Sequence, residues 1–85
     1  MAELTFVIPV GPAHVALADR AIAAARTQTV PCAVLSMHDT AQRGPGVLRN
    51  QMLAKVETEF VTFLDADDWI EPTFAEETIV EYRRI

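Results

Sequence analysis

The chain has 85 residues, 51% of them hydrophobic and 22% charged, a composition typical of one small globular domain. Its formal net charge is −5 and it has no stripe of basic residues, so binding to a nucleic-acid backbone is not expected. The single cysteine, Cys32, excludes an internal disulfide and a cysteine-based zinc site. A single cysteine also fits a reducing compartment, and we find neither a membrane span nor a signal peptide. We therefore expect a cytoplasmic protein.

The first expected element is a strand near the amino terminus. Residues 4–10 form a nearly continuous apolar run, which is typical of a central strand covered on both faces. Pro9 cannot donate to a strand ladder, so regular pairing is predicted to end at about Ile8. After a turn, residues 13–27 are rich in alanine and predict a helix, with Val15 at the start of its apolar face.

A second strand and a second helix are expected next. Residues 32–38 are apolar and predict a strand. Residues 39–46 are polar and rich in turn-forming residues, so they predict a loop. Residues 47–56 predict a helix with Leu53 on its apolar face and Arg49 in its first turn, pointing elsewhere.

The third expected strand ends in a group of carboxylates. Residues 60–64 are strong β-formers and predict a buried strand. Asp65, Asp67 and Asp68 follow at once, and they cannot be buried unless something compensates their charge. Two aspartates separated by one residue can hold a hard divalent cation, because oxygen ligands suit Mg²⁺ and Mn²⁺; a solvated turn is the alternative. Pro72 predicts the first position of a last helix.

The order of these elements, β-α-β-α-β-α, predicts an α/β fold with a parallel sheet and right-handed crossovers. If the first strand is central, the strand order is 2-1-3 and helices cover both faces, in a small three-layer Rossmann-like arrangement. Ligands of such sheets bind beyond the carboxyl ends of the strands, at the switch point. That crevice is expected to gather the following residues: Pro9-Val10-Gly11, Asp39 and Asp65-Ala66-Asp67.

Other phosphate- and metal-binding classes do not fit. Residues 65–76 imitate an EF-hand loop, but Ile70 stands where glycine is needed. A P-loop is excluded because the chain has no Gly-Lys-Ser/Thr motif. Phosphoryl transfer on an aspartate would need acids after the first strand and a helpful lysine, whereas Lys55 is the only lysine and the strand ends in Pro9-Val10.

Three side chains outside these motifs have open roles. His14 is expected at the surface near the start of the first helix. Trp69 could stack on a sugar or base, and it is equally suited to anchor the last helix in the core. Arg43 could fold over a diphosphate, and a solvated arginine is the alternative.

Five segments occur in an order that is more specific than any one of them alone. They are Phe6-Val7-Ile8-Pro9-Val10, Gln28-Thr29, Asp39, Gly46-Val47-Leu48-Arg49-Asn50, and Phe63-Leu64-Asp65-Ala66-Asp67-Asp68 with Pro72 shortly after. Together they resemble the amino-terminal, nucleotide-binding half of family 2 glycosyltransferases, which have the GT-A fold. The resemblance covers nearly the whole chain.

The resemblance implies a nucleotide sugar, expected to be a UDP-sugar, bound with Mn²⁺ or Mg²⁺. Asp39 would accept a hydrogen bond from the base, and Arg49 would reach the base or the phosphates. Asp65 would contact the ribose or the metal, and Asp67 would ligate the metal that bridges the diphosphate. The implied nucleotide-binding residues are Pro9, Val10, Gly11, Asp39, Arg49, Asp65 and Ala66, and the implied metal ligands are Asp65 and Asp67.

Two departures from the family pattern bear on catalysis. Family members usually carry another helix and strand where this chain has only the short loop after Asp39. Residues 1–85 are expected to form one minimal domain without the acceptor-binding half, which in the family supplies the general base. The resemblance still favours a metal-dependent glycosyltransferase, but its catalytic residues stay unassigned. The alternatives are a non-catalytic nucleotide-sugar-binding module, or a half-enzyme completed by a partner or a second copy. Free sheet edges predict a homo-oligomer.

Overall fold

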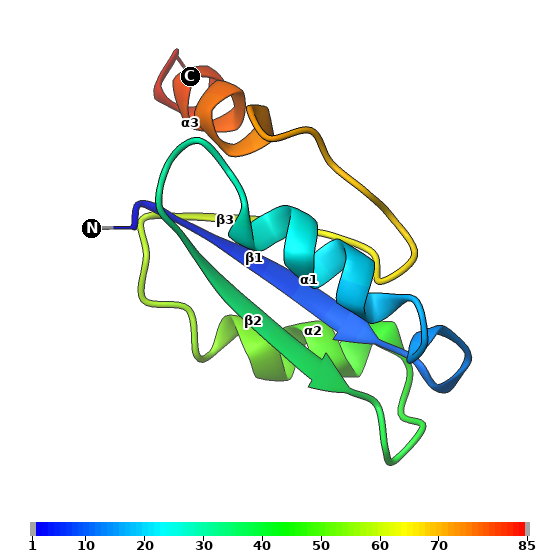
Figure 1. Ribbon diagram of the computed structural model, residues 1–85. Helices are drawn as coiled ribbons and strands as arrows, with labels where there is room; N and C mark the ends of the chain where they lie inside the picture. Colours follow the sequence, from blue (N-terminus) through cyan, green and yellow to red (C-terminus); the bar gives the residue numbers. More distant parts are fainter. Residues whose placement is uncertain (1, 85) are drawn as a thin grey trace.

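The computed structural model describes residues 2–84, which fold as a sheet between two layers of helices (Figure 1). The strands β1 (Leu4–Val10), β2 (Cys32–His38) and β3 (Phe60–Phe63) are parallel and lie in the order β2-β1-β3. The predicted α/β class and the predicted strand order 2-1-3 are confirmed. Within the described residues, no helix is long and apolar enough to cross a membrane.

The central strand β1 is buried along its whole length and separates two hydrophobic cores. One of its faces packs against α1 (Ala18–Arg26) and α3 (Phe74–Arg84), largely through alanines of these helices. On the other face, Val7 packs against Met52 of α2 (Pro45–Leu53). The helices therefore cover both faces of the sheet, as alternating side-chain directions in a strand require.

The prediction that pairing ends at Ile8 is wrong, because β1 continues through Pro9 to Val10. Val10 lies opposite His38 of β2, and its carbonyl accepts a hydrogen bond from the next residue after β2. The backbone of Pro9 faces the β3 side, where pairing has already ended at Val7 and Phe63. The missing N–H of Pro9 therefore costs no hydrogen bond in the ladder.

The predicted helix over residues 13–27 is shorter in the structure and begins at Ala18. A 3-10 turn, η1 (Pro12–His14), precedes it, and its hydrogen bonds run from His14 N to the Gly11 carbonyl and from Leu17 N to the His14 carbonyl, at 3.0 Å each. Because this tighter winding changes the angular spacing of side chains, Val15 is 47% exposed instead of lying on the buried face.

The second helix and third strand are also shorter or more exposed than predicted. Helix α2 runs from Pro45 to Leu53, so Arg49 lies in its second turn and Leu53 is exposed at its end. Phe63 is 42% exposed, which contradicts the expectation of a buried strand. The reason is that β3 is an edge strand, paired on one side only and through four residues.

The last helix begins at Phe74 and not at Pro72, because contacts with the segment after α1 determine its start. The Pro72 carbonyl accepts a hydrogen bond from Thr29 N at 2.8 Å, whereas the Thr73 carbonyl accepts from Glu77 N at 3.0 Å. The side-chain oxygen of Gln28 accepts from Ala75 N at 2.8 Å and so caps the first turn. Trp69 is 52% exposed and is therefore not the core anchor considered above; its neighbour Ile70 is buried instead.

Candidate functional site

The carboxyl ends of the three strands open into one pocket with a cavity volume of about 460 Å³. Six residues expected at this switch point line it: Pro9, Gly11, Asp39, Asp65, Ala66 and Asp67. The remaining lining comes from η1, through Pro12, Ala13 and His14, and from α2, through Pro45 and Leu48. The structure thus brings together residues from four separate stretches of the chain, because parallel strands end at the same edge of the sheet.

Two residues of the expected site do not line this pocket. Val10 is fully buried, and its side chain belongs to the core under α1 and α3. Arg49 stands beside the pocket. Its guanidinium lies 5.5 Å from the centre of the Phe63 ring, and its Nη2 is 3.5 Å from Asp65 Oδ1. The Nε of Arg49 is buried and has no hydrogen-bond partner, so this side chain has donor capacity that the fold does not use.

Asp39 organises the loop that leads into α2, a role that its sequence position alone did not reveal. Its two carboxylate oxygens accept hydrogen bonds from the backbone N–H groups of Arg43, at 2.9 Å, and Gly44, at 2.8 Å. Gly44 has a φ of 92°, in the region that favours glycine. The carboxylate is buried and lines the pocket. Each oxygen has a second lone pair, so Asp39 can also accept from a ligand.

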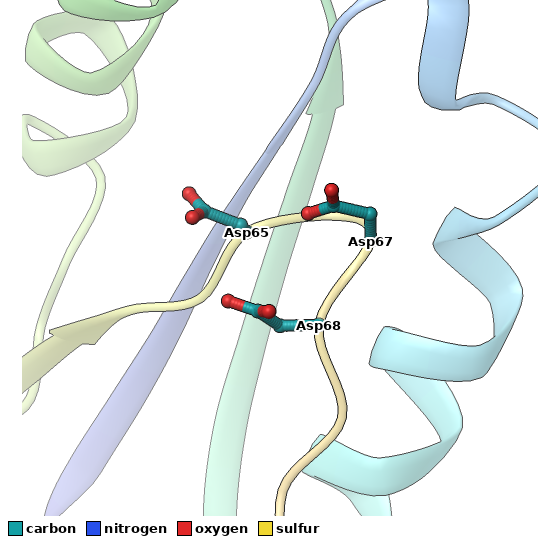
Figure 2. Close-up of side chains that lie close together, drawn as sticks. All are labelled: Asp65, Asp67 and Asp68. Atoms are coloured by element: carbon teal, nitrogen blue, oxygen red, sulfur yellow. The ribbon is translucent and has the colours of Figure 1, made fainter.

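The acidic cluster, defined here as Asp65, Asp67 and Asp68, follows β3 on a loop whose neighbouring side chains are anchored. Leu64 and Ala66 are buried, while the three carboxylates are exposed (Figure 2). One oxygen from each carboxylate lies within 4.8 Å of the other two. Like charges this close repel one another. Oxygen donors on a solvent-facing loop fit Mn²⁺ or Mg²⁺, which commonly keep part of their water shell.

Comparison with known proteins identifies the family. The model of the family "Glycosyl transferase family 2" matches residues 18–84, from the start of α1 to the end of α3. The chain belongs to this family. The Bacillus subtilis (strain 168) protein named "Putative glycosyltransferase EpsH" is 40% identical over 37 residues, which are 44% of this chain and 11% of that protein. The match thus spans about a tenth of the length of this curated relative. No solved structure matches the chain.

In this family 2 chain, the pocket also contains a histidine that the sequence analysis left at the surface. His14 ends η1, and its Nε2 lies 3.9 Å from Asp67 Oδ2 across the pocket. Its side chain is 46% exposed. The available signal was its position in the connection after the central strand, since that connection must pass the switch point.

Two other reactive or aromatic side chains of the family 2 chain lie outside the pocket lining. Cys32 pairs with Leu4 at the amino-terminal end of the sheet, the end opposite the pocket. Burial raises the pKa of the Cys32 thiol, so it stays protonated at neutral pH and is a poor nucleophile. Trp69 is exposed just beyond the acidic cluster, where its ring is available to solvent.

Proposed function

We propose that this domain binds a nucleoside diphosphate or nucleotide sugar, with uracil as its base, together with a Mn²⁺ or Mg²⁺ ion in the pocket at the carboxyl ends of the strands. The observation that carries the proposal is the position of two residues of the acidic cluster, Asp65 and Asp67, on the wall of this pocket, at the switch point of a family 2 chain. A cavity of about 460 Å³ falls within the usual size range of small-molecule sites.

The shape of the pocket supports one orientation of the nucleotide. Pro9, Gly11 and the apolar side chain of Leu48 provide a surface for the flat base and the ribose. Asp39, on the same side, provides an acceptor for a base N–H. The phosphates then extend toward Asp65 and Asp67, with Ala66 buried beneath them.

The charge of the pocket supports the proposed requirement for a cation. Asp39, Asp65 and Asp67 line it, and no lysine or arginine does so among the described residues. Without compensation, these carboxylates would repel a diphosphate. A divalent ion on Asp65 and Asp67 reverses that balance, and in a transfer reaction it stabilises the departing nucleoside diphosphate. The positive end of the α2 dipole, at Pro45 on the pocket wall, adds a smaller attraction.

Arg49 provides a second source of positive charge next to the phosphates. In the structure it offsets the charge of Asp65 from 3.5 Å, with both side chains substantially exposed. Such an exposed pair is weak. A ligated Asp65 would therefore release Arg49 at little cost, and its unused donor would become available to the nucleotide.

The reaction we favour is glycosyl transfer, which also requires a general base to deprotonate the acceptor hydroxyl. We assign no such base within this chain, so residues 1–85 are proposed as the donor-binding domain. The acceptor side is proposed to lie outside these residues, and a purely nucleotide-sugar-binding module is the alternative.

The strands β2 and β3 lie at the two edges of the sheet, and such edges favour self-association. We therefore propose a homo-oligomer. A monomeric mass by light scattering at high micromolar concentration would contradict it.

Isothermal titration with UDP, with and without Mn²⁺, tests the proposal directly. We expect UDP to bind only when Mn²⁺ is present, and UDP-glucose to bind under the same condition. When an aspartate of the acidic cluster is replaced by asparagine, Asp19→Asn is the matched control. Asp19 is an exposed acid on α1 outside the pocket, so its replacement should leave binding unchanged. Binding of GDP or CDP instead of UDP would overturn the uridine assignment alone. Failure of all three nucleotides with metal present would refute the donor site.

A further inference from the structure

The pocket needs a hydrogen-bond donor for phosphate, and one lining side chain provides a nitrogen donor. The titratable side chains among the described lining residues are three carboxylates and the imidazole of His14. Carboxylates are acceptors when ionised, whereas an imidazole carries an N–H in both its neutral and its protonated form. The family model matches residues 18–84 and therefore assigns nothing to His14.

The position of His14 is set by the backbone. The two 3.0 Å hydrogen bonds of η1, one donated by His14 N and one accepted by its carbonyl, hold the residue on both sides. Nδ1 faces Gly11, with 3.9 Å between this nitrogen and the point where a Cβ on Gly11 would lie. Nε2 faces the pocket and stands 3.9 Å from Asp67 Oδ2, which is too long for a hydrogen bond. The backbone is therefore held at His14, and the ring lies beside Asp67, where Nε2 can donate to a ligand.

Arg49, the phosphate contact implied by the family resemblance, is less well placed in this chain. Its guanidinium lies over Phe63 and pairs with Asp65, outside the pocket lining. His14 lies inside the lining and next to Asp67. We propose that His14 donates a hydrogen bond from Nε2 to a phosphate oxygen of the bound nucleotide, so that the site selects diphosphates over nucleosides. This inference rests on the proposed function, and it adds a specificity-determining residue to the site.

The test compares a nucleotide with its nucleoside. Affinities for UDP and for uridine are measured in the presence of Mn²⁺ by equilibrium dialysis, which registers weak binding. Because a hydrogen bond to a charged group is lost, His14→Ala should weaken UDP binding about tenfold or more and leave uridine binding unchanged. His14→Gln carries an amide N–H that reaches a similar point, and it should restore most of the UDP affinity.

His38→Ala is the matched control, because His38 is an exposed imidazole at the end of β2 that does not line this pocket. Mn²⁺ binding without nucleotide, followed by electron paramagnetic resonance, should be the same in the parent protein and in His14→Ala. Unchanged UDP affinity in His14→Ala, or an equal loss for UDP and uridine, would overturn the inference. Weaker Mn²⁺ binding in this variant would also overturn it, since His14 would then act through Asp67.

The two proposals fail in different ways. If the parent protein binds UDP with Mn²⁺ and His14→Ala binds it equally well, the donor site stands and the role of His14 falls. If the parent protein binds none of UDP, GDP and CDP, both fall together. If GDP or CDP binds in place of UDP, the same comparison is made with that nucleotide and its nucleoside, with the same expected loss.

Discussion

The two ends of the sheet differ in how far their acidic side chains are paired with cations. At the amino-terminal end, Arg83 pairs with Glu3 at 2.9 Å and also approaches Glu59 at 4.0 Å. At the carboxyl end, three aspartates lie close together, with the Arg49 guanidinium at 3.5 Å from Asp65 and the His14 imidazole at 3.9 Å from Asp67. The amino-terminal end sets one arginine against two glutamates, whereas the carboxyl end sets one arginine against three aspartates and so retains the larger excess of negative charge. This excess opposes folding, and the proposed cation would relieve it.

The largest effect that would sharpen this comparison is expected at Asp67. Asp67→Asn should weaken Mn²⁺-dependent nucleotide binding on the order of a hundredfold, because the metal loses a charged ligand. The same variant should melt above the parent protein in metal-free buffer, since it removes a repulsive charge.

Thermal melting with and without Mn²⁺ and UDP measures both effects of Asp67→Asn. In the parent protein, ligand at about 100 times its Kd adds about 2.7 kcal/mol to the free energy of unfolding. A variant that keeps the full metal response would remove Asp67 from the metal site. A variant that melts below the parent without metal would contradict the repulsion within the acidic cluster.

A smaller effect is expected at Gln28, where a substitution should lower stability and leave nucleotide binding unchanged. Its side chain accepts from Ala75 N at 2.8 Å and donates to the Glu71 carbonyl at 2.9 Å, which ties the start of α3 to the end of α1. Gln28→Ala should lower the free energy of unfolding by about 1–3 kcal/mol, because the capped N–H loses its partner. Urea unfolding measures this change.

Nucleotide affinity provides the second readout for Gln28→Ala. We expect the folded variant to bind UDP and Mn²⁺ as the parent protein does, because Leu64 and Ile70 anchor the acidic loop independently of Gln28. A large loss of affinity in a folded variant would show that α3 positions the cluster. The two ends of the sheet would then not be separable.

The smallest effect is expected at Arg83, which pairs with Glu3 at the amino-terminal end of the sheet. Arg83→Ala should cost less than about 1 kcal/mol of stability, because the ion pair with Glu3 is about half exposed on both sides. Raising the salt concentration should reduce the difference between variant and parent. A cost well above this in urea unfolding would mean that packing of the Arg83 side chain over Phe60, 5.8 Å from the ring centre, matters more than its charge.

Sequence reasoning succeeded where a local pattern and the topology agreed. The apolar run of β1 predicted a central strand, and the alternation of strands and helices predicted the order β2-β1-β3. It failed where neighbours from distant segments decided the outcome. Pro9 stays in the strand because β3 has already ended beside it, and Pro72 lies outside α3, where its carbonyl accepts a hydrogen bond from Thr29.

The sequence by itself determined the family, the order of the elements and the edge of the sheet where the acidic cluster lies. These follow from local periodicity and from the rule that parallel strands end together. Only the tertiary structure decided which side chains share the pocket. In the structure, His14 lies beside Asp67 and the Arg49 guanidinium lies over the Phe63 ring. The Asp39 carboxylate accepts hydrogen bonds from the backbone of the loop before α2. The contacts of His14 and Arg49 depend on packing between segments far apart in the chain, and those of Asp39 depend on the conformation of the loop that follows it.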